Sequence, residues 1–203
     1  MIRTLGLAAV AAALILPLAP APASAETHVV RDARGDMTRV TSDLVNGGVV
    51  KTRPDRAQSK ADIVRLRTRY GARALQVTIK FRELPTGPEA DGWWGGYVSV
   101  ETPERRYNAS FHPTRGRVRV ELRTGSGGSR DCRRLKGATL VKRSAVQVTI
   151  PASCLDAPRW VRTGAHAGYQ PESALPDSWS DDARATGWNG DGPPALGPRI
   201  RRG

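Results

Sequence analysis

The sequence contains few of the residues that commonly supply catalytic or cofactor chemistry. Only two cysteines, two methionines and three histidines occur among its 203 residues. The histidines are widely separated and show none of the close spacings that hold a metal ion. No P-loop, glycine-rich nucleotide fingerprint or EF-hand loop is present. Because no nucleophile, base and orienting group can be assembled from the chain, we expect no enzymatic activity.

Long apolar runs are also scarce. The single example, Leu5 to Leu18, follows a short basic start and leads into a Pro/Ala stretch ending in Ala-Ser-Ala at 23–25. This pattern predicts a secretory signal peptide over 1–25, cleaved before Glu26. A membrane anchor is the alternative, but it needs about 20 unbroken apolar residues, and three prolines interrupt this run. We therefore expect a secreted, extracellular protein without a transmembrane segment.

The two cysteines, Cys132 and Cys154, both fall in the part of the chain predicted to be exported. An even number of cysteines in an oxidising compartment favours a disulfide bond. A catalytic thiol is the alternative, but no histidine lies in a recognisable nucleophile context near either cysteine. We predict that the pair is structural.

A hydrophobic period near 3.6 is absent as well, whereas alternation with period 2 recurs. Residues 64–70 and 75–81 alternate apolar with polar side chains, and the short link between them contains Gly71. This pattern predicts an antiparallel hairpin with one buried face. The buried face then requires these opposite pairs: Tyr70 with Leu75, Thr68 with Val77, Leu66 with Ile79, and Val64 with Phe81. The same register places Arg65 opposite Lys80, an unfavourable pair of like charges unless something screens it.

Four further segments, 96–101, 117–123, 138–150 and 159–169, continue the strand pattern, and a short helical turn is indicated at "PASCLD". A sheet with one apolar face must bury it, and without helices a second sheet must cover it. We predict an all-β, antiparallel β-sandwich of jelly-roll type over residues 26–169. Residues 170–203 are rich in Pro, Gly, Asp and Ser, which predicts an irregular or disordered tail. Within this tail, Trp179 and Trp188 are candidates to fold back onto the sandwich.

Positive charge is abundant, with 27 arginines, 5 lysines and a net charge of +13. Guanidinium groups bind phosphate and carboxylate in a bidentate fork, so the polar flank of the hairpin, Arg65, Arg67, Arg69 and Lys80, is a candidate anion-binding surface. The alternative is that the arginine bias reflects a GC-rich genome and a solvated face that opposes aggregation. Nucleic acid is disfavoured, because no aromatic residues are interleaved among these cations for base stacking.

Tryptophans are a second source of binding candidates. Trp93 and Trp94 are adjacent in "DGWWGGY", so in an extended segment at most one enters the core. An exposed tryptophan can stack on a sugar ring, whereas a buried one fills volume. We place Trp160 in the core.

Three carboxylates, Asp32, Asp36 and Asp62, lie at strand ends and in loops, where a hard cation such as calcium collects oxygen ligands. The alternative is turn chemistry, in which Asp and Gly cap the backbone. We favour turn chemistry, because calcium needs about 6 to 8 oxygens and the sequence identifies only a few. No cofactor is therefore assigned, although calcium stays open.

Several segments together resemble known exported proteins. The order Asp-x-x-Gly-Asp (32–36), "DIVRLRTRYGARALQVTIKFREL" (62–84), a cysteine near 132 and "VQVTIPASCLDAPRWVRTGA" (146–165) resembles a group of exported actinobacterial proteins of uncharacterised function. The first part also resembles DOMON-like and family-9 carbohydrate-binding β-sandwiches. The resemblance implies a jelly-roll-like sandwich, but no sugar-binding or haem-binding residues of those families match here.

We therefore predict a secreted, monomeric, non-catalytic binding module for an extracellular glycan or an acidic cell-envelope polymer. One alternative is an enzyme or enzyme inhibitor with a loop-borne site, in which the three carboxylates or His112 surround a metal. Another is a purely structural exported protein.

Overall fold

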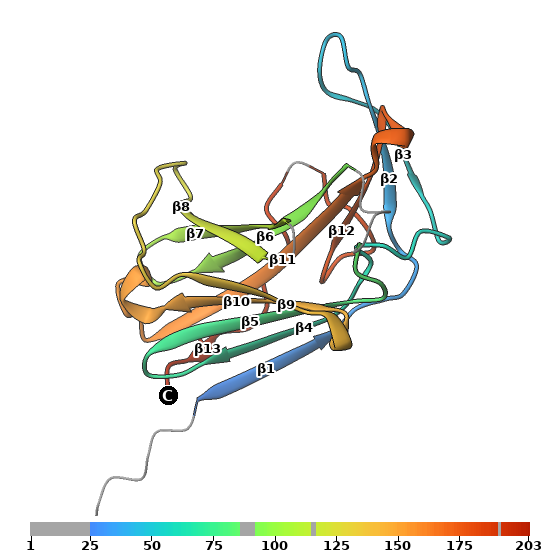
Figure 1. Cartoon of the computed structure of the whole chain (residues 1–203). Helices are drawn as coiled ribbons and strands as arrows, with labels where there is room; N and C mark the ends of the chain where they lie inside the picture. Colours follow the sequence, from blue (N-terminus) through green and yellow to red (C-terminus); the bar gives the residue numbers. More distant parts are fainter. Residues whose placement is uncertain (1–24, 86–91, 115–116, 191) are drawn as a thin grey trace, which may run out of the picture.

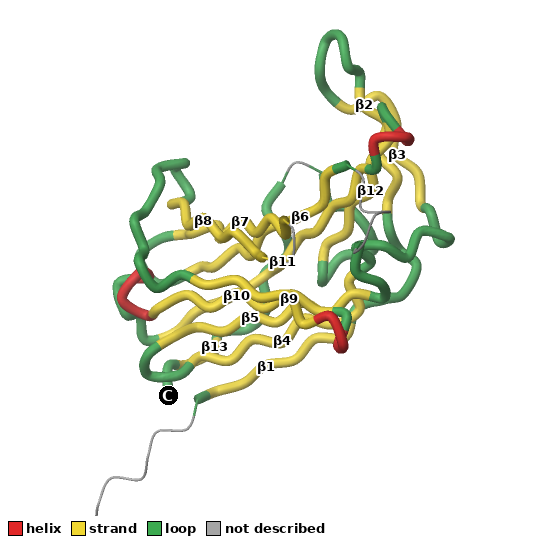
Figure 2. Tube along the Cα trace, viewed as in Figure 1, coloured by secondary structure: helices red, strands yellow, loops and turns green. Residues whose placement is uncertain are grey.

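A computed structural model describes residues 25–85, 92–114, 117–190 and 192–203. The predicted signal peptide, except for Ala25, lies outside these residues. No α-helix occurs among the described residues, which form strands joined by loops and three short 3-10 turns (Figure 2). None of the described helical segments is long and apolar enough to span a membrane.

The elements are, in chain order, β1 (Glu26–Arg31), β2 (Thr38–Ser42), β3 (Val49–Pro54), β4 (Ile63–Tyr70), β5 (Ala74–Phe81), β6 (Trp93–Glu101), β7 (Arg106–Thr114), β8 (Arg117–Thr124), β9 (Lys136–Leu140), η1 (Val141–Arg143), β10 (Ala145–Pro151), η2 (Ala152–Leu155), β11 (Trp160–Gln170), η3 (Glu172–Ala174), β12 (Asp177–Asp182) and β13 (Ile200–Arg201). The turn η2 confirms the short helical turn predicted at "PASCLD".

All the described strands belong to one hydrogen-bonded sheet. Its order is β1-β4-β5-β10-β9-β8-β7-β6-β11-β12-β2-β3, and β13 pairs with β11 beside this path. The strand pairs are antiparallel, which confirms the predicted all-β antiparallel class. Because the hydrogen bonding runs through a single path, the prediction of two stacked sheets is not confirmed.

The sheet folds back on itself, so that one group of strands lies over another (Figure 1). The lower layer contains β1, β4, β5, β10 and β9, and the upper layer contains β8, β7, β6 and β11. A buried hydrogen bond between the hydroxyls of Thr68 on β4 and Thr163 on β11 joins the layers at 2.7 Å. The C-terminus reaches the lower layer, where the Gly203 amide donates to the carbonyl of Tyr70. The interior between the layers holds the core.

The core follows from the alternation of apolar residues along each strand. The predicted hairpin between β4 and β5 is confirmed, with Tyr70, Thr68 and Leu66 opposite the predicted partners. The fourth pair is wrong, because a β-bulge between Ile63 and Arg65 shifts the register. Ile63, fully buried, takes the inward position opposite Phe81 that was predicted for Val64.

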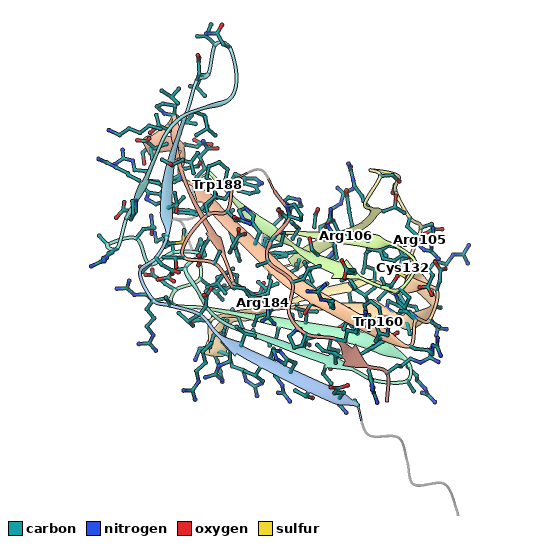
Figure 3. The ribbon with its side chains drawn as sticks, turned by 180° about the vertical axis from the view of Figure 1, so that it is seen from behind. Arg105, Arg106, Cys132, Trp160, Arg184 and Trp188 are labelled. Carbon is teal, nitrogen blue, oxygen red and sulfur yellow. A yellow bond between two sulfur atoms is a disulfide. The ribbon has the colours of Figure 1, made fainter. Side chains whose placement is uncertain are left out.

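The region after β11 differs from the predicted irregular tail. It contains β12, which pairs with both β11 and β2, and it buries Ala183 and Ile200. Both tryptophans fold back as expected. Trp179 donates to Asp55 Oδ2 at 2.9 Å. The backbone amide of Trp188, a residue labelled in Figure 3, donates to Thr38 Oγ1 at 3.0 Å. The β12 sequence, "DSWSDD", shows no apolar alternation, so its strand character was not visible in the sequence.

Trp160 is half-buried rather than in the core, which corrects its prediction. The inward position next to it on β11 is taken by Val161, and the guanidinium of Arg199 lies 4.4 Å from the Trp160 ring centroid. The ring therefore covers the edge of the interior and holds a cation at the surface.

The predicted disulfide between Cys132 and Cys154 is present. It joins the segment before β9 to η2, at a sequence separation of 22 residues (Figure 3). Replacing both cysteines by alanine should lower the free energy of unfolding by about 3 kcal/mol, because the unfolded chain regains the entropy of the open loop. Urea unfolding of the double variant measures this loss. An unchanged unfolding midpoint would show that the bond contributes nothing to stability.

Candidate functional site

Positive side chains are aligned on the outer face of the lower layer. Arg31 of β1, Arg65 of β4 and Lys80 of β5 lie directly opposite one another on three neighbouring strands. Arg67 and Arg69 follow on the same face of β4, and all five side chains are exposed. We call these five residues the arginine face. The predicted pairing of Arg65 with Lys80 is thus confirmed and extends to a third cation.

Only one acidic residue occurs on the described strands of this layer. The strands β4, β5, β9 and β10 contain no acidic residue. The one acid of β1, Glu26, accepts a hydrogen bond from the backbone of Arg201. Among the described residues, no member of the arginine face forms a salt bridge. Like charges directly opposite each other destabilise a sheet, so the strands carry an electrostatic cost that nothing in this layer offsets.

Two hollows lie on this face. The first is polar and is lined by Arg67, Arg69, Gln76, Thr78 and Gln147. The second is lined mainly by cations from β5, from η1 and from the loops around them, namely Arg34, Lys80, Arg82, Lys142 and Arg143. Among the described residues, only Arg82 of this second set has an acidic partner, at 3.7 Å from Asp62. Both hollows therefore present donors to an incoming anion.

The two adjacent tryptophans separate as the alternation of β6 requires. Trp94 is 8% exposed and meets Phe81 edge to face in the core, so it is unavailable to a ligand. Trp93 is 46% exposed and lies beside His112, with ring centroids 6.1 Å apart. It projects from the outer face of the upper layer. The two groups of predicted binding residues, Trp93 and the arginine face, thus lie in different layers.

Two of the three predicted carboxylates, Asp36 and Asp62, lie close together, and the third member of the group is Asp181 rather than Asp32. One carboxylate oxygen from each of Asp36, Asp62 and Asp181 lies within 4.8 Å of the other two. Asp36 is in the loop between β1 and β2, Asp62 immediately precedes β4, and Asp181 is in β12. Asp32 is outside this group of three, although it is close enough to interact with Asp36 electrostatically. Turn chemistry alone does not account for this convergence of distant segments.

These carboxyl groups are held in a medium that opposes their ionisation. Burial, together with the charges of Asp36, Asp32 and Asp62, raises the pKa of Asp181 to about 8. Burial, followed by the charge of Asp36, raises the pKa of Asp32 to about 7. The pKa values of Asp36 and Asp62 are also raised, in both cases mainly by burial. The surroundings of the cluster therefore disfavour the charged form of these carboxyl groups.

Sequence reasoning missed Asp181 because it lies in the segment read as a tail. The repeated acids of "SWSDD" were the only signal, since adjacent acids on a strand point to opposite faces. Asp181 points into the cluster, whereas Asp182 binds His166 Nδ1 at 3.0 Å. His112 contacts Trp93 and is not among the clustered residues, so the predicted alternative of a loop-borne site with His112 at a metal has no support from the geometry.

No protein-family model, curated protein or solved structure matches this chain. The resemblances drawn from the sequence therefore stay predictions.

Proposed function

We propose that the chain is a secreted, non-catalytic binding module that uses the arginine face to bind an acidic cell-envelope polymer. We propose that the fold that carries this surface is a jelly-roll-like sandwich, formed by the sheet that folds back on itself. The observation that carries the proposal is the row of Arg31, Arg65 and Lys80, in direct register on a layer whose other strands contain no acid. A polymer with regularly spaced phosphate or carboxylate groups supplies the missing negative charge.

The geometry favours an extended ligand over a small one. The cations follow β4 along its length and continue across β5 toward η1, so they form a surface rather than an enclosed pocket. Guanidinium groups bind phosphate and carboxylate through paired N–H donors, which adds orientation to the charge attraction. The affinity for the polymer then comes from many contacts of moderate energy, and it depends steeply on the salt concentration.

A neutral glycan is the second candidate, and Trp93 is the observation that favours it. The ring lies near the glycines of two neighbouring strands: a Cβ built at Gly168 would approach Trp93 Cζ3 to 3.0 Å, and one at Gly95 would lie 3.5 Å from Cζ2. An exposed indole supported on a glycine floor offers a flat stacking surface for a sugar ring. This surface is in the other layer, so the two candidates are tested independently.

Binding to immobilised polymers tests the proposal. The purified chain is applied to a glycerol-phosphate polymer, a polyuronate, single-stranded DNA and a neutral glucan at increasing salt. We expect retention by the acidic envelope-type polymers, with log affinity falling linearly with log salt. No retention by any polyanion at low salt would overturn the proposal. Retention by the glucan that is insensitive to salt and is lost in Trp93→Ala would instead establish the second candidate, and preference for DNA would contradict the assigned ligand class.

A further inference from the structure

Three distant chain segments deliver a carboxylate to one point beside β12. Asp36, Asp62 and Asp181 each place one oxygen within 4.8 Å of the others. Asp62 and Asp181 have no exposed surface, and Asp36 is partly buried. Segments this far apart in sequence do not meet by local turn preference, so the tertiary fold itself assembles the cluster.

Each of the three carboxylates is oriented in the same way. One oxygen accepts a backbone N–H from another part of the chain: Gly35 donates to Asp62 Oδ2 at 2.8 Å, Ile63 to Asp181 Oδ2 at 2.7 Å, and Gly187 to Asp36 Oδ2 at 3.3 Å. The other oxygen, Oδ1 in every case, is buried and has no hydrogen-bond partner among the described residues. A polar atom in this condition costs about 1 to 3 kcal/mol, and more when charged.

The cationic side chains nearby do not form hydrogen bonds with these carboxylate oxygens. Arg82 Nη1 is 3.7 Å from Asp62 Oδ2, beyond hydrogen-bond distance, and the Arg82 side chain is 42% exposed. Asp32, the neighbouring carboxylate, also has a buried oxygen, Oδ2, without a partner in the described part of the chain. Arg184 interacts electrostatically with Asp32, and no salt bridge joins the two in the described part of the chain. Buried carboxylates with unused lone pairs then require either protons or another cation.

We propose that Asp36, Asp62 and Asp181 form a binding site for a calcium ion. Calcium is held by oxygen atoms at about 2.3 to 2.6 Å, so two oxygens on one ion are at most about 5 Å apart, which the observed spread satisfies. Magnesium, at about 2.0 to 2.1 Å, spans at most about 4.2 Å and needs stricter geometry. The backbone N–H bonds to the Oδ2 atoms orient the carboxylates, as hydrogen bonds commonly do for metal ligands.

The position of the site gives it a structural consequence. The ion joins the loop after β1, the start of β4 and β12, and β12 is the strand that connects β2 and β3 to the rest of the sheet. Calcium binding therefore stabilises the attachment of this end of the sheet. No residue of the arginine face is among the three ligands, although Arg82 of the second hollow lies 3.7 Å from Asp62.

Calcium titration of the metal-stripped chain tests the site. We expect one ion per chain by calorimetry, a Kd between about 1 μM and 1 mM, and a rise in Tm of about 5 °C or more at calcium 100 times the Kd. Magnesium should bind at least tenfold more weakly. Asp181→Asn should abolish the Tm response, whereas Asp177→Asn, on the same strand but paired with Arg39 outside the cluster, should keep it.

Three results would overturn the assignment. They are no heat and no Tm shift up to about 10 mM calcium, equal affinity for magnesium, and full calcium binding by Asp181→Asn. Circular dichroism checks that each variant is folded. Where Asp181→Asn is not folded, Asp36→Asn takes its place, because Asp36 is only partly buried and its substitution perturbs less of the core. The titration of the unaltered chain decides the proposal in any case.

Discussion

Replacing Arg65, Arg67 and Arg69 together by glutamine should weaken binding to the acidic polymer about 100-fold at low salt. Each charged contact contributes on the order of 1 kcal/mol, and three of them correspond to about two decades in affinity. The slope of log affinity against log salt should also fall by about 2 to 3, because three fewer counterions are released. Isothermal titration at several salt concentrations measures both quantities.

The same variant should not lose stability, which separates binding from folding. Arg65 lies opposite cations on both neighbouring strands, and removing its charge relieves that repulsion. The free energy of unfolding should therefore stay the same or rise by about 0.5 kcal/mol. A group of charges that lowers stability is typical of a functional surface.

The matched control removes the same number of charges from the other layer. Arg117, Arg119 and Arg123 lie on β8, where Glu121 is 2.9 Å from Arg119 and 3.8 Å from Arg123. Glutamine at these three positions lowers the net charge equally but leaves the arginine face intact. If this control weakens binding as much as the first variant, net charge rather than the arginine face attracts the polymer, and the proposed surface is wrong.

The sequence predicted those features that depend on one strand or one hairpin. The register of β4 and β5 from Leu66 to Tyr70 and the pairing of Arg65 with Lys80 both follow from a period of two. The β-bulge at Val64 was not predictable in this way, because Ile63 and Val64 are both apolar and the sequence pattern lets either of them occupy the inward position. Alternation along one strand thus predicts which residues face the interior, but it does not predict where a β-bulge shifts the register.

Features assembled from distant segments were harder to foresee. The acidic cluster needs Asp181, whose strand has a polar inward position facing other carboxylates, so the usual apolar signal of a strand is missing. The order of the sheet likewise depends on long-range pairs such as β11 with β6, which no alternation pattern specifies. The only sequence signal for a cation site was the presence of acidic residues at strand ends and in loops.

Gly96→Ala, which adds one methyl group in β6, should cause a large loss of stability. Gly96 lies in β6 between Ala167 of β11 and Phe111 of β7, and a Cβ at this position would be 2.1 Å from the carbonyl oxygen of His166. It would also meet Ala167 Cα and Phe111 Cζ at 2.9 Å. Two of these three contacts are backbone atoms of a central strand, which cannot rotate away. We expect a loss of about 3 kcal/mol or more, or about 10 °C in Tm.

The close approach explains why two glycines follow the tryptophans in β6. The layer folds back tightly over the interior, and a strand whose backbone nearly touches its neighbour's carbonyl requires glycine. Gly192→Ala is the control, since it is in a loop and its nearest contact is Asn189 O at 3.7 Å, and it should change Tm little. Thermal unfolding by circular dichroism compares the two. Equal stability would mean that β6 and β11 are farther apart than the register requires, and the packing of Trp94 against Phe81 beneath them would then need another explanation.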